Sequence, residues 1–255
     1  MGQIDVTHLP YISLLAVLLA LFAAGTTKGL IGIGMPIVAV PLLNIVVDLR
    51  VTVALLSIPL IITNVPQAIK GDPISIVLRR LTPIFVGLII GVFVGVSLLA
   101  STSPAVLKPV VGIILIAIAV LMLLSPRLSV STKVEPIAGP VAGLVGGLAG
   151  GLAALPGPFV FMYLLALGIN RDRFVQYSSM FLTVAATLMT LTLGGKGLLG
   201  WSDAAISTLA TLPIFAGMWI GTHVRRFVSA EIFRKLMLGV VAVSGVHLVA
   251  SAISA

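Results

Sequence analysis

The chain has 255 residues, of which 59% are hydrophobic and only 9% are charged, and its mean hydropathy is +1.26. Such a chain has too little polar surface for a soluble domain, so the composition predicts an all-α protein that crosses a membrane several times. The net charge of +8 does not indicate nucleic acid, because most Lys and Arg residues lie in short connections between apolar runs, as membrane topology requires.

Ten apolar segments are bounded by charged or turn residues, at 11–24, 35–47, 51–69, 81–100, 105–125, 137–155, 158–169, 174–194, 204–224 and 231–252. Most reach the roughly 20 residues that a helix needs to span the hydrocarbon core. Segments 11–24, 35–47 and 158–169 are shorter, so we expect half-spans there unless flanking residues extend them. No Lys or Arg precedes Lys28, so the first segment lacks the basic region of a signal peptide and is expected to be retained.

Two interruptions of the apolar pattern stand out. GTTKGLIGIGMP (25–36) separates the first two segments, and GGLAALPGP (150–158) separates the sixth from the seventh. Paired interruptions at matching places indicate a transporter's binding site, because broken helices expose unpaired N–H groups and a positive dipole end at membrane depth. The sequence therefore predicts a small-anion site between the two breaks, contacted by the backbone around Thr27, Lys28, Gly29, Gly32 and Gly34 in the first and Ala154, Pro156 and Gly157 in the second.

The two halves of the chain resemble each other at a nearly constant offset. Gly29, Pro36 and Ser57 lie 122 residues before Gly151, Pro158 and Ser179, whereas Pro83, Gly87 and Gly91 lie 130 before Pro213, Gly217 and Gly221. This pattern predicts an internal duplication, with repeats at 11–125 and 137–252 and a solvated cytoplasmic loop at 126–136.

Charge then decides the relative orientation of the repeats. If each broken segment were one span, the repeats would be parallel and the basic residues would divide almost evenly between the two sides. If each broken segment enters and returns, as a re-entrant hairpin or as two spans, eleven Lys and Arg residues share one side against three: Arg50, Lys108 and Lys196. The positive-inside rule therefore predicts inverted repeats with 8 to 10 membrane segments, cytoplasmic basic loops and both termini outside.

Glycines recur every four residues in the apolar segments. They are Gly139, Gly143, Gly147 and Gly151, then Gly87, Gly91 and Gly95, and finally Gly217 and Gly221. Such ridges let helix backbones approach closely in lipid, so we interpret them as packing surfaces.

Polar side chains follow one face of the segment after each break. Ser57, Asn64 and Gln67 lie in the first half, and Gln176, Ser179, Thr183, Thr187 and Thr190 in the second. Ser and Thr in membrane helices usually bond their own backbone, whereas an amide in hydrocarbon is costly without a partner. We therefore assign hydrogen bonds to the anion to Asn64, Gln67, Gln176 and Ser179. Lys28 is either an interfacial lysine that reaches the headgroups or the counter-charge of the anion, and the lack of an intramembrane acid favours the second reading.

The remaining chemistry argues against an enzyme. All seven carboxylates lie in loops or at segment ends, and His8, His223 and His247 show no metal-ligand spacing. Cysteine is absent, which excludes thiol catalysis, disulfides and iron–sulfur clusters. We expect no metal and no cofactor.

The motifs resemble those of the TauE/SafE family of membrane permeases, the sulfite exporters, over nearly the whole chain. GLIGIGMPIVAVPLL (29–43) is similar to the family's first glycine motif, Lys70-Gly71-Asp72 to its turn, and GGLAALPGPFVFMYLLALGI (150–169) to its second motif. In the family's first motif three or four glycines are often consecutive, whereas here Ile33 and Met35 interrupt them. The resemblance implies export of sulfite or a short organosulfonate across a bacterial inner membrane.

The expected partners are thus a small anion, the lipid bilayer and, in a homodimer, a second copy of the chain. Without membrane carboxylates, the membrane potential is the expected driving force. Two alternatives remain: a permease or importer of another small solute, proton-linked through His247, and a membrane scaffold that transports nothing.

Overall fold

The computed structural model describes residues 10–124, 130–131 and 133–224, and the single residues 239, 243 and 246. Within these ranges the chain forms helices and no strand, which confirms the predicted all-α membrane protein. The last expected segment, 231–252, lies outside the described residues except at those three positions. His247, the first nine residues and the C-terminal end lie outside them as well.

Ten helices follow one another in the described part of the chain. They are α1 (Tyr11–Ile31), α2 (Met35–Leu43), α3 (Leu49–Ala68), α4 (Ile74–Ser101), α5 (Pro104–Leu124), α6 (Glu135–Ala153), α7 (Gly157–Ala166), α8 (Arg171–Gly195), α9 (Trp201–Leu209) and α10 (Thr211–Val224). Seven segments there are long and apolar enough to span a membrane: α1, α3, α4, α5, α6, α8, and α9 with α10 together. Helices α2 and α7 are too short for a full span.

Helix α1 corrects the expected position of the first break. It continues through Gly25, Lys28 and Gly29 to Ile31, so flanking residues extend the first segment to a helix of 21 residues, which was the expected alternative to a half-span. The break itself is only Gly32–Gly34, where both glycines have positive φ, of 94° and 95°. The break is shorter than the sequence suggested, because Gly25 and Gly29 do not interrupt α1. Gly25 and Gly29 instead allow α10 to approach α1, and in lipid the helix keeps its own hydrogen bonds.

The second break lies where the sequence predicted it. Helix α6 ends at Ala153, and Ala154 adopts the left-handed conformation with φ of 55°. Helix α7 then begins at Gly157. In contrast, the single expected segment 204–224 consists of two helices that meet at Ala210.

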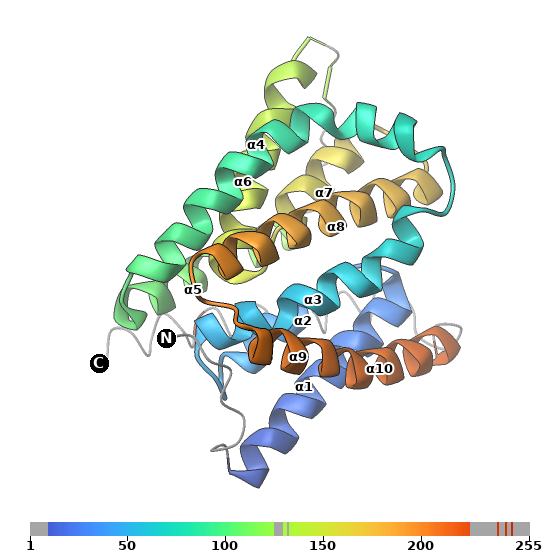
Figure 1. Ribbon diagram of the computed structural model, residues 1–255. Helices are drawn as coiled ribbons and strands as arrows, with labels where there is room; N and C mark the ends of the chain where they lie inside the picture. The colour runs from blue at the N-terminus through green and yellow to red at the C-terminus, as the bar shows by residue number, and fades with distance from the viewer. Residues whose placement is uncertain are drawn as a thin grey trace.

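Two parallel helix pairs flank a central antiparallel pair (Figure 1). Helix α4 packs along α6, and α1 along α10, through the glycine ridges. A Cβ atom at Gly91, Gly147 or Gly221 would lie within 2.6 Å of a backbone oxygen of the facing helix, closer than any side chain tolerates. The ridges are therefore packing surfaces, as predicted. Helices α3 and α8 run side by side in opposite directions between the two pairs.

The glycine contacts of the two helix pairs correspond at an offset that differs from the one the sequence suggested. Gly91 meets α6 at Leu144 and Leu148, and Gly217 meets α1 at Phe22 and Thr26, positions 122 residues earlier. Gly217 thus occupies the place of Gly91, an offset of 126, and not that of Gly87, as the offset of 130 implied. The difference of four residues is about one helical turn, which a pattern of glycines every four residues cannot distinguish.

Candidate functional site

Lys28 forms the centre of the candidate site. It lies in the last turn of α1 and its side chain is only 2% exposed. Its Nζ donates a hydrogen bond of 2.5 Å to Oδ1 of Asn64 in α3. The Asn64 amide is itself fully buried, and its Nδ2 donates to the carbonyl of Leu60, one turn earlier in α3, at 2.7 Å. The structure therefore joins two of the predicted site residues directly.

The Lys28 ammonium has unused hydrogen-bonding capacity. An ammonium group has three N–H donors, and Asn64 accepts from one of them. No carboxylate lies in an ion pair with Lys28 within the described residues, where the acids sit at helix ends: Asp72 pairs with Arg173, and Glu135 with Arg80. A buried cation without a counter-ion is costly, so this arrangement favours an anionic ligand.

A second polar pair lies close to the first break. Ser179 of α8 donates to Oε1 of Gln67 at 3.1 Å. The Nε2 atom of Gln67 lies 3.9 Å from the place where a side chain on Gly32 would begin. This amide donor has no acceptor among the residues that the structure describes, so it is available to a ligand beside the break.

The backbone of the first break supplies further donors. The Gly32 N–H closes α1 by bonding the Lys28 carbonyl at 2.7 Å. The N–H groups of Ile33 and Gly34 lie between α1 and α2 and have no acceptor in the described part of the chain. Fewer backbone donors are exposed than the sequence suggested, because the N–H groups of Thr27, Lys28 and Gly29 lie within α1.

Thr27 and Gly29 contribute to packing in this structure. The Thr27 hydroxyl bonds the Ala23 carbonyl of its own helix. A Cβ atom on Gly29 would lie 2.3 Å from the Met218 carbonyl oxygen of α10. Thr183, Thr187 and Thr190 of α8 also bond their own helix, which confirms the expectation for hydroxyls in membrane helices.

The side chain of Gln176, in α8, bonds the backbone at the end of α3 and in the turn between α3 and α4. Its Oε1 accepts from Asp72 N at 2.9 Å, and its Nε2 donates to Asp72 O at 2.8 Å and Ala68 O at 3.3 Å. Gly71 has φ of 130°, and a Cβ atom there would lie 2.6 Å from Gln176 Oε1. Both the oxygen and the nitrogen of the Gln176 amide therefore hold this turn on α8. We call Gln176 and the residues that hold Asp72 on α8 the clamp, and Gln67 and Ser179 lie close to it in the chain.

The residues of this clamp include two that were not predicted from the sequence, Arg173 and Tyr177. Arg173 Nε lies 3.0 Å from Asp72 Oδ2, and the Tyr177 hydroxyl donates to the same oxygen at 3.3 Å. The signal was present in the Lys-Gly-Asp turn and in the basic and aromatic residues of early α8. Nothing in one sequence indicated that segments 100 residues apart would meet.

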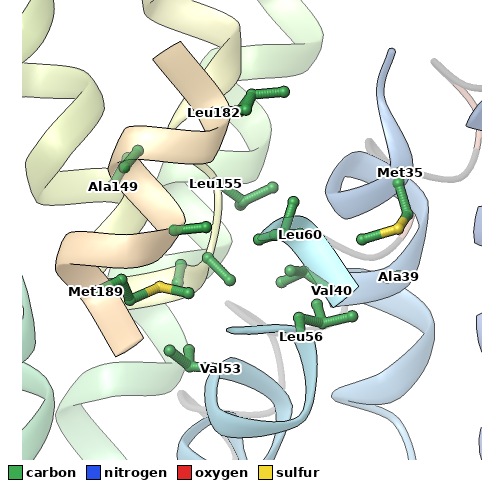
Figure 2. Close-up of a cluster of buried hydrophobic side chains, with 14 of the residues drawn as sticks. Met35, Ala39, Val40, Val53, Leu56, Leu60, Ala149, Leu155, Leu182 and Met189 are labelled. Atoms are coloured by element: carbon green, nitrogen blue, oxygen red, sulfur yellow. The ribbon is translucent and has the colours of Figure 1, made fainter. Parts of the chain in front are cut away.

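The second break contributes apolar surface. Figure 2 shows buried side chains from α2, α3, α8 and the second break converging in one cluster, including Met35, Leu60, Leu155 and Met189. The structure shows no polar contact that joins Ala154, Pro156 or Gly157 to Lys28, Asn64, Gln67 or Ser179 in the part of the chain it describes. The described residues also contain no group of His, Cys, Asp and Glu that could hold a metal ion.

The apolar cluster and the polar pairs occupy different levels of the two central helices. Leu56 and Leu60 precede Asn64 along α3, and Met189 follows Ser179 along α8. Because α3 and α8 are antiparallel (Figure 1), Leu56, Leu60 and Met189 lie on the same side of the polar pairs.

Comparison with known proteins adds one finding. Residues 17–248 match the family model described as Sulfite exporter TauE/SafE. No curated protein matches the chain, and no solved structure does.

Proposed function

Since the chain belongs to the sulfite exporter TauE/SafE family and is a multi-pass membrane transporter, we propose that it exports a small sulfur-containing anion across the bacterial inner membrane. The observation that carries this proposal is the buried Lys28 ammonium, which is held by Asn64 and has no acid partner among the residues that the structure describes. Membership in a family of transporters also favours transport over a scaffold role.

The donors around the first break suit an oxyanion. Lys28 Nζ supplies charge, and Gln67 Nε2 and the N–H groups of Ile33 and Gly34 supply uncharged donors. A sulfite or sulfonate group has three oxygens and accepts several such bonds at once. Hydrogen bonds to a charged group are each worth about 1.5–3 kcal/mol, so a few of them offset the loss of hydration.

The antiparallel packing of α3 and α8 supports inverted repeats. Parallel repeats would place these two helices, which occupy the same position in the two halves, in the same direction. The equivalent packing of α4 on α6 and of α10 on α1 agrees with the same symmetry. With the basic loops in the cytoplasm, the Lys28 and Asn64 pair lies toward the cytoplasm and the apolar cluster lies toward the outside.

The apolar cluster then acts as the outer barrier in this conformation. An anion bound at Lys28 leaves outward only when Leu60, Leu155 and Met189 separate, and these residues come from both halves. Movement of one repeat against the other would open this layer, as alternating access requires.

Export is driven by the membrane potential in this proposal. The acids that the structure describes lie at helix ends or in turns, including the buried Asp203 in the first turn of α9, and an inside-negative potential favours the exit of each negative charge by about 2.3 kcal/mol per 100 mV. This corresponds to a concentration ratio of about fifty per 100 mV for a monovalent anion.

Proteoliposomes test this proposal. Vesicles loaded with methanesulfonate or sulfite are given a potassium–valinomycin potential of either sign, and efflux is followed. We expect fast efflux of the anion when the potential drives anions out and slow efflux when it is reversed. Efflux of dimethyl sulfone, the uncharged control, should be the same in vesicles with and without the protein. Efflux that does not depend on the sign of the potential would contradict the electrogenic mechanism.

A further inference from the structure

Helix α3 lacks one of its own hydrogen bonds a little before Asn64, at a proline of the kind that bends helices. Pro59 lies inside the helix, and its ring nitrogen cannot donate to the carbonyl of Leu55, four residues earlier. Two residues before Pro59, the Ser57 hydroxyl donates to the Ala54 carbonyl at 2.7 Å. The Leu55 carbonyl therefore has no backbone donor at the usual position in its own helix. In lipid, such a carbonyl needs a partner from outside the helix.

Ser207 of α9 supplies a hydrogen bond to this carbonyl. Its Oγ donates to the Leu55 carbonyl at 2.9 Å and accepts from the Ile58 N–H at 3.3 Å. The Ser207 side chain is fully buried, although most of α9 is exposed, and the buried residues of this helix are Asp203 and Ser207. One hydroxyl from the second half of the chain therefore replaces the hydrogen bond that Pro59 removes.

The same segment also contacts the helix that carries Lys28. Helix α9 continues into α10, which packs on α1 around Lys28: the Met218 carbonyl faces Gly29, and Gly221 faces Thr26. Residues 201–224 thus touch α3 through Ser207 and α1 through the glycine ridge. These are the two helices whose side chains form the 2.5 Å bond between Lys28 and Asn64.

We propose that Ser207 is a positioning residue of the anion site: it holds the bend of α3 at Pro59 and thereby places Asn64 against Lys28. The inference rests on the proposed function of that pair. It is specific to one half of the chain, because α8 contains no proline and has Phe181 at the position 122 residues after Pro59.

The geometry makes the site sensitive to this bend. Asn64 lies five residues beyond Pro59, about 7 Å along the helix axis, so a change of about 10° in the bend moves it by about 1 Å. A displacement of that size is enough to break the bond between Lys28 and Asn64. At Ile69, the same change gives a shift of about 2–3 Å.

Spin labels test the bend directly. The natural chain has no cysteine, so Leu19→Cys in α1 and Ile69→Cys after α3 give a clean label pair at two exposed positions. We expect Ser207→Ala to shift or broaden the distance distribution measured by double electron–electron resonance. Thr208→Val is the matched control, since its exposed hydroxyl bonds Ala204 within α9, and it leaves the distribution unchanged.

Binding is measured in the same variants with methanesulfonate. Ser207→Ala is expected to raise Kd about tenfold, the loss of one charge-assisted hydrogen bond, while Thr208→Val binds as the wild type does. Pro59→Ala gives residue 59 an N–H that can donate to the Leu55 carbonyl. We therefore expect the double variant Pro59→Ala/Ser207→Ala to have the same Kd and the same label distance as Pro59→Ala alone.

An unchanged distance in Ser207→Ala, or additive effects with Pro59→Ala, would overturn the positioning role. Failure of the wild type to bind methanesulfonate or sulfite contradicts the proposed function instead. In that case the distance measurements alone decide whether Ser207 holds the bend of α3.

Discussion

Replacing Lys28 by methionine tests the assigned site most directly. Methionine keeps the length and volume of the side chain and removes only the charge and the bond to Asn64 Oδ1. Lys28 is 2% exposed, so burial removes its charge from most contact with solvent in the folded protein. The variant therefore separates binding of an anion from packing of α1.

Two terms of opposite sign set the stability of Lys28→Met. The change removes a buried ammonium, which stabilises the protein, and leaves Asn64 Oδ1 without its donor, which costs about 1–3 kcal/mol. We expect the free energy of unfolding to change by no more than about 1–2 kcal/mol. Binding loses at least one charge-assisted hydrogen bond, about 1.5–3 kcal/mol, so Kd rises about 10- to 150-fold.

The assay is isothermal titration of the detergent-solubilised protein with sulfite and methanesulfonate, alongside thermal unfolding without ligand. Lys196→Met is the matched control, because Lys196 lies exposed at the end of α8, above the Phe93 ring. It removes one positive charge far from the break and should leave Kd unchanged. Wild-type affinity in folded Lys28→Met would refute the assignment of Lys28 as the counter-charge.

Three further predictions follow from the packing and from the polar contacts. Gly143→Ala should lower the melting temperature by several degrees, because its Cβ would lie 1.9 Å from the Ile84 carbonyl oxygen, whereas Gly195→Ala, with open space around it, should leave the melting temperature unchanged. Gln176→Leu removes three hydrogen bonds from the turn after α3 and should cost about 1–3 kcal/mol of unfolding free energy; an unchanged denaturation midpoint would exclude the clamp. In the Lys28→Met background, Asn64→Leu should weaken anion binding less than it does alone, and simple additivity of the two changes in binding free energy would show that the pair does not act as a unit.

The amino-acid sequence by itself determined the class of protein and the position of most helices. Apolar runs of membrane length in a sequence predict helices reliably, because in lipid the backbone of such a run satisfies its hydrogen bonds within its own helix. Glycine spacing likewise predicted which surfaces pack closely. Lys28 and Asn64 were singled out because a charge and an amide are costly in hydrocarbon wherever they lie.

The tertiary structure decided which polar residues meet. Two hydrogen bonds join segments that are more than 100 residues apart, between Gln67 and Ser179 and between Gln176 and Asp72. Ser207 obtains its partner only because Pro59 leaves the Leu55 carbonyl without a helix donor. The extent of α1 also depended on tertiary contacts, since glycine weakens an isolated helix, whereas Gly25 and Gly29 lie within α1 where α10 packs against them. Local sequence states which groups need partners in a membrane, and only the packing of distant helices states which partner each one obtains.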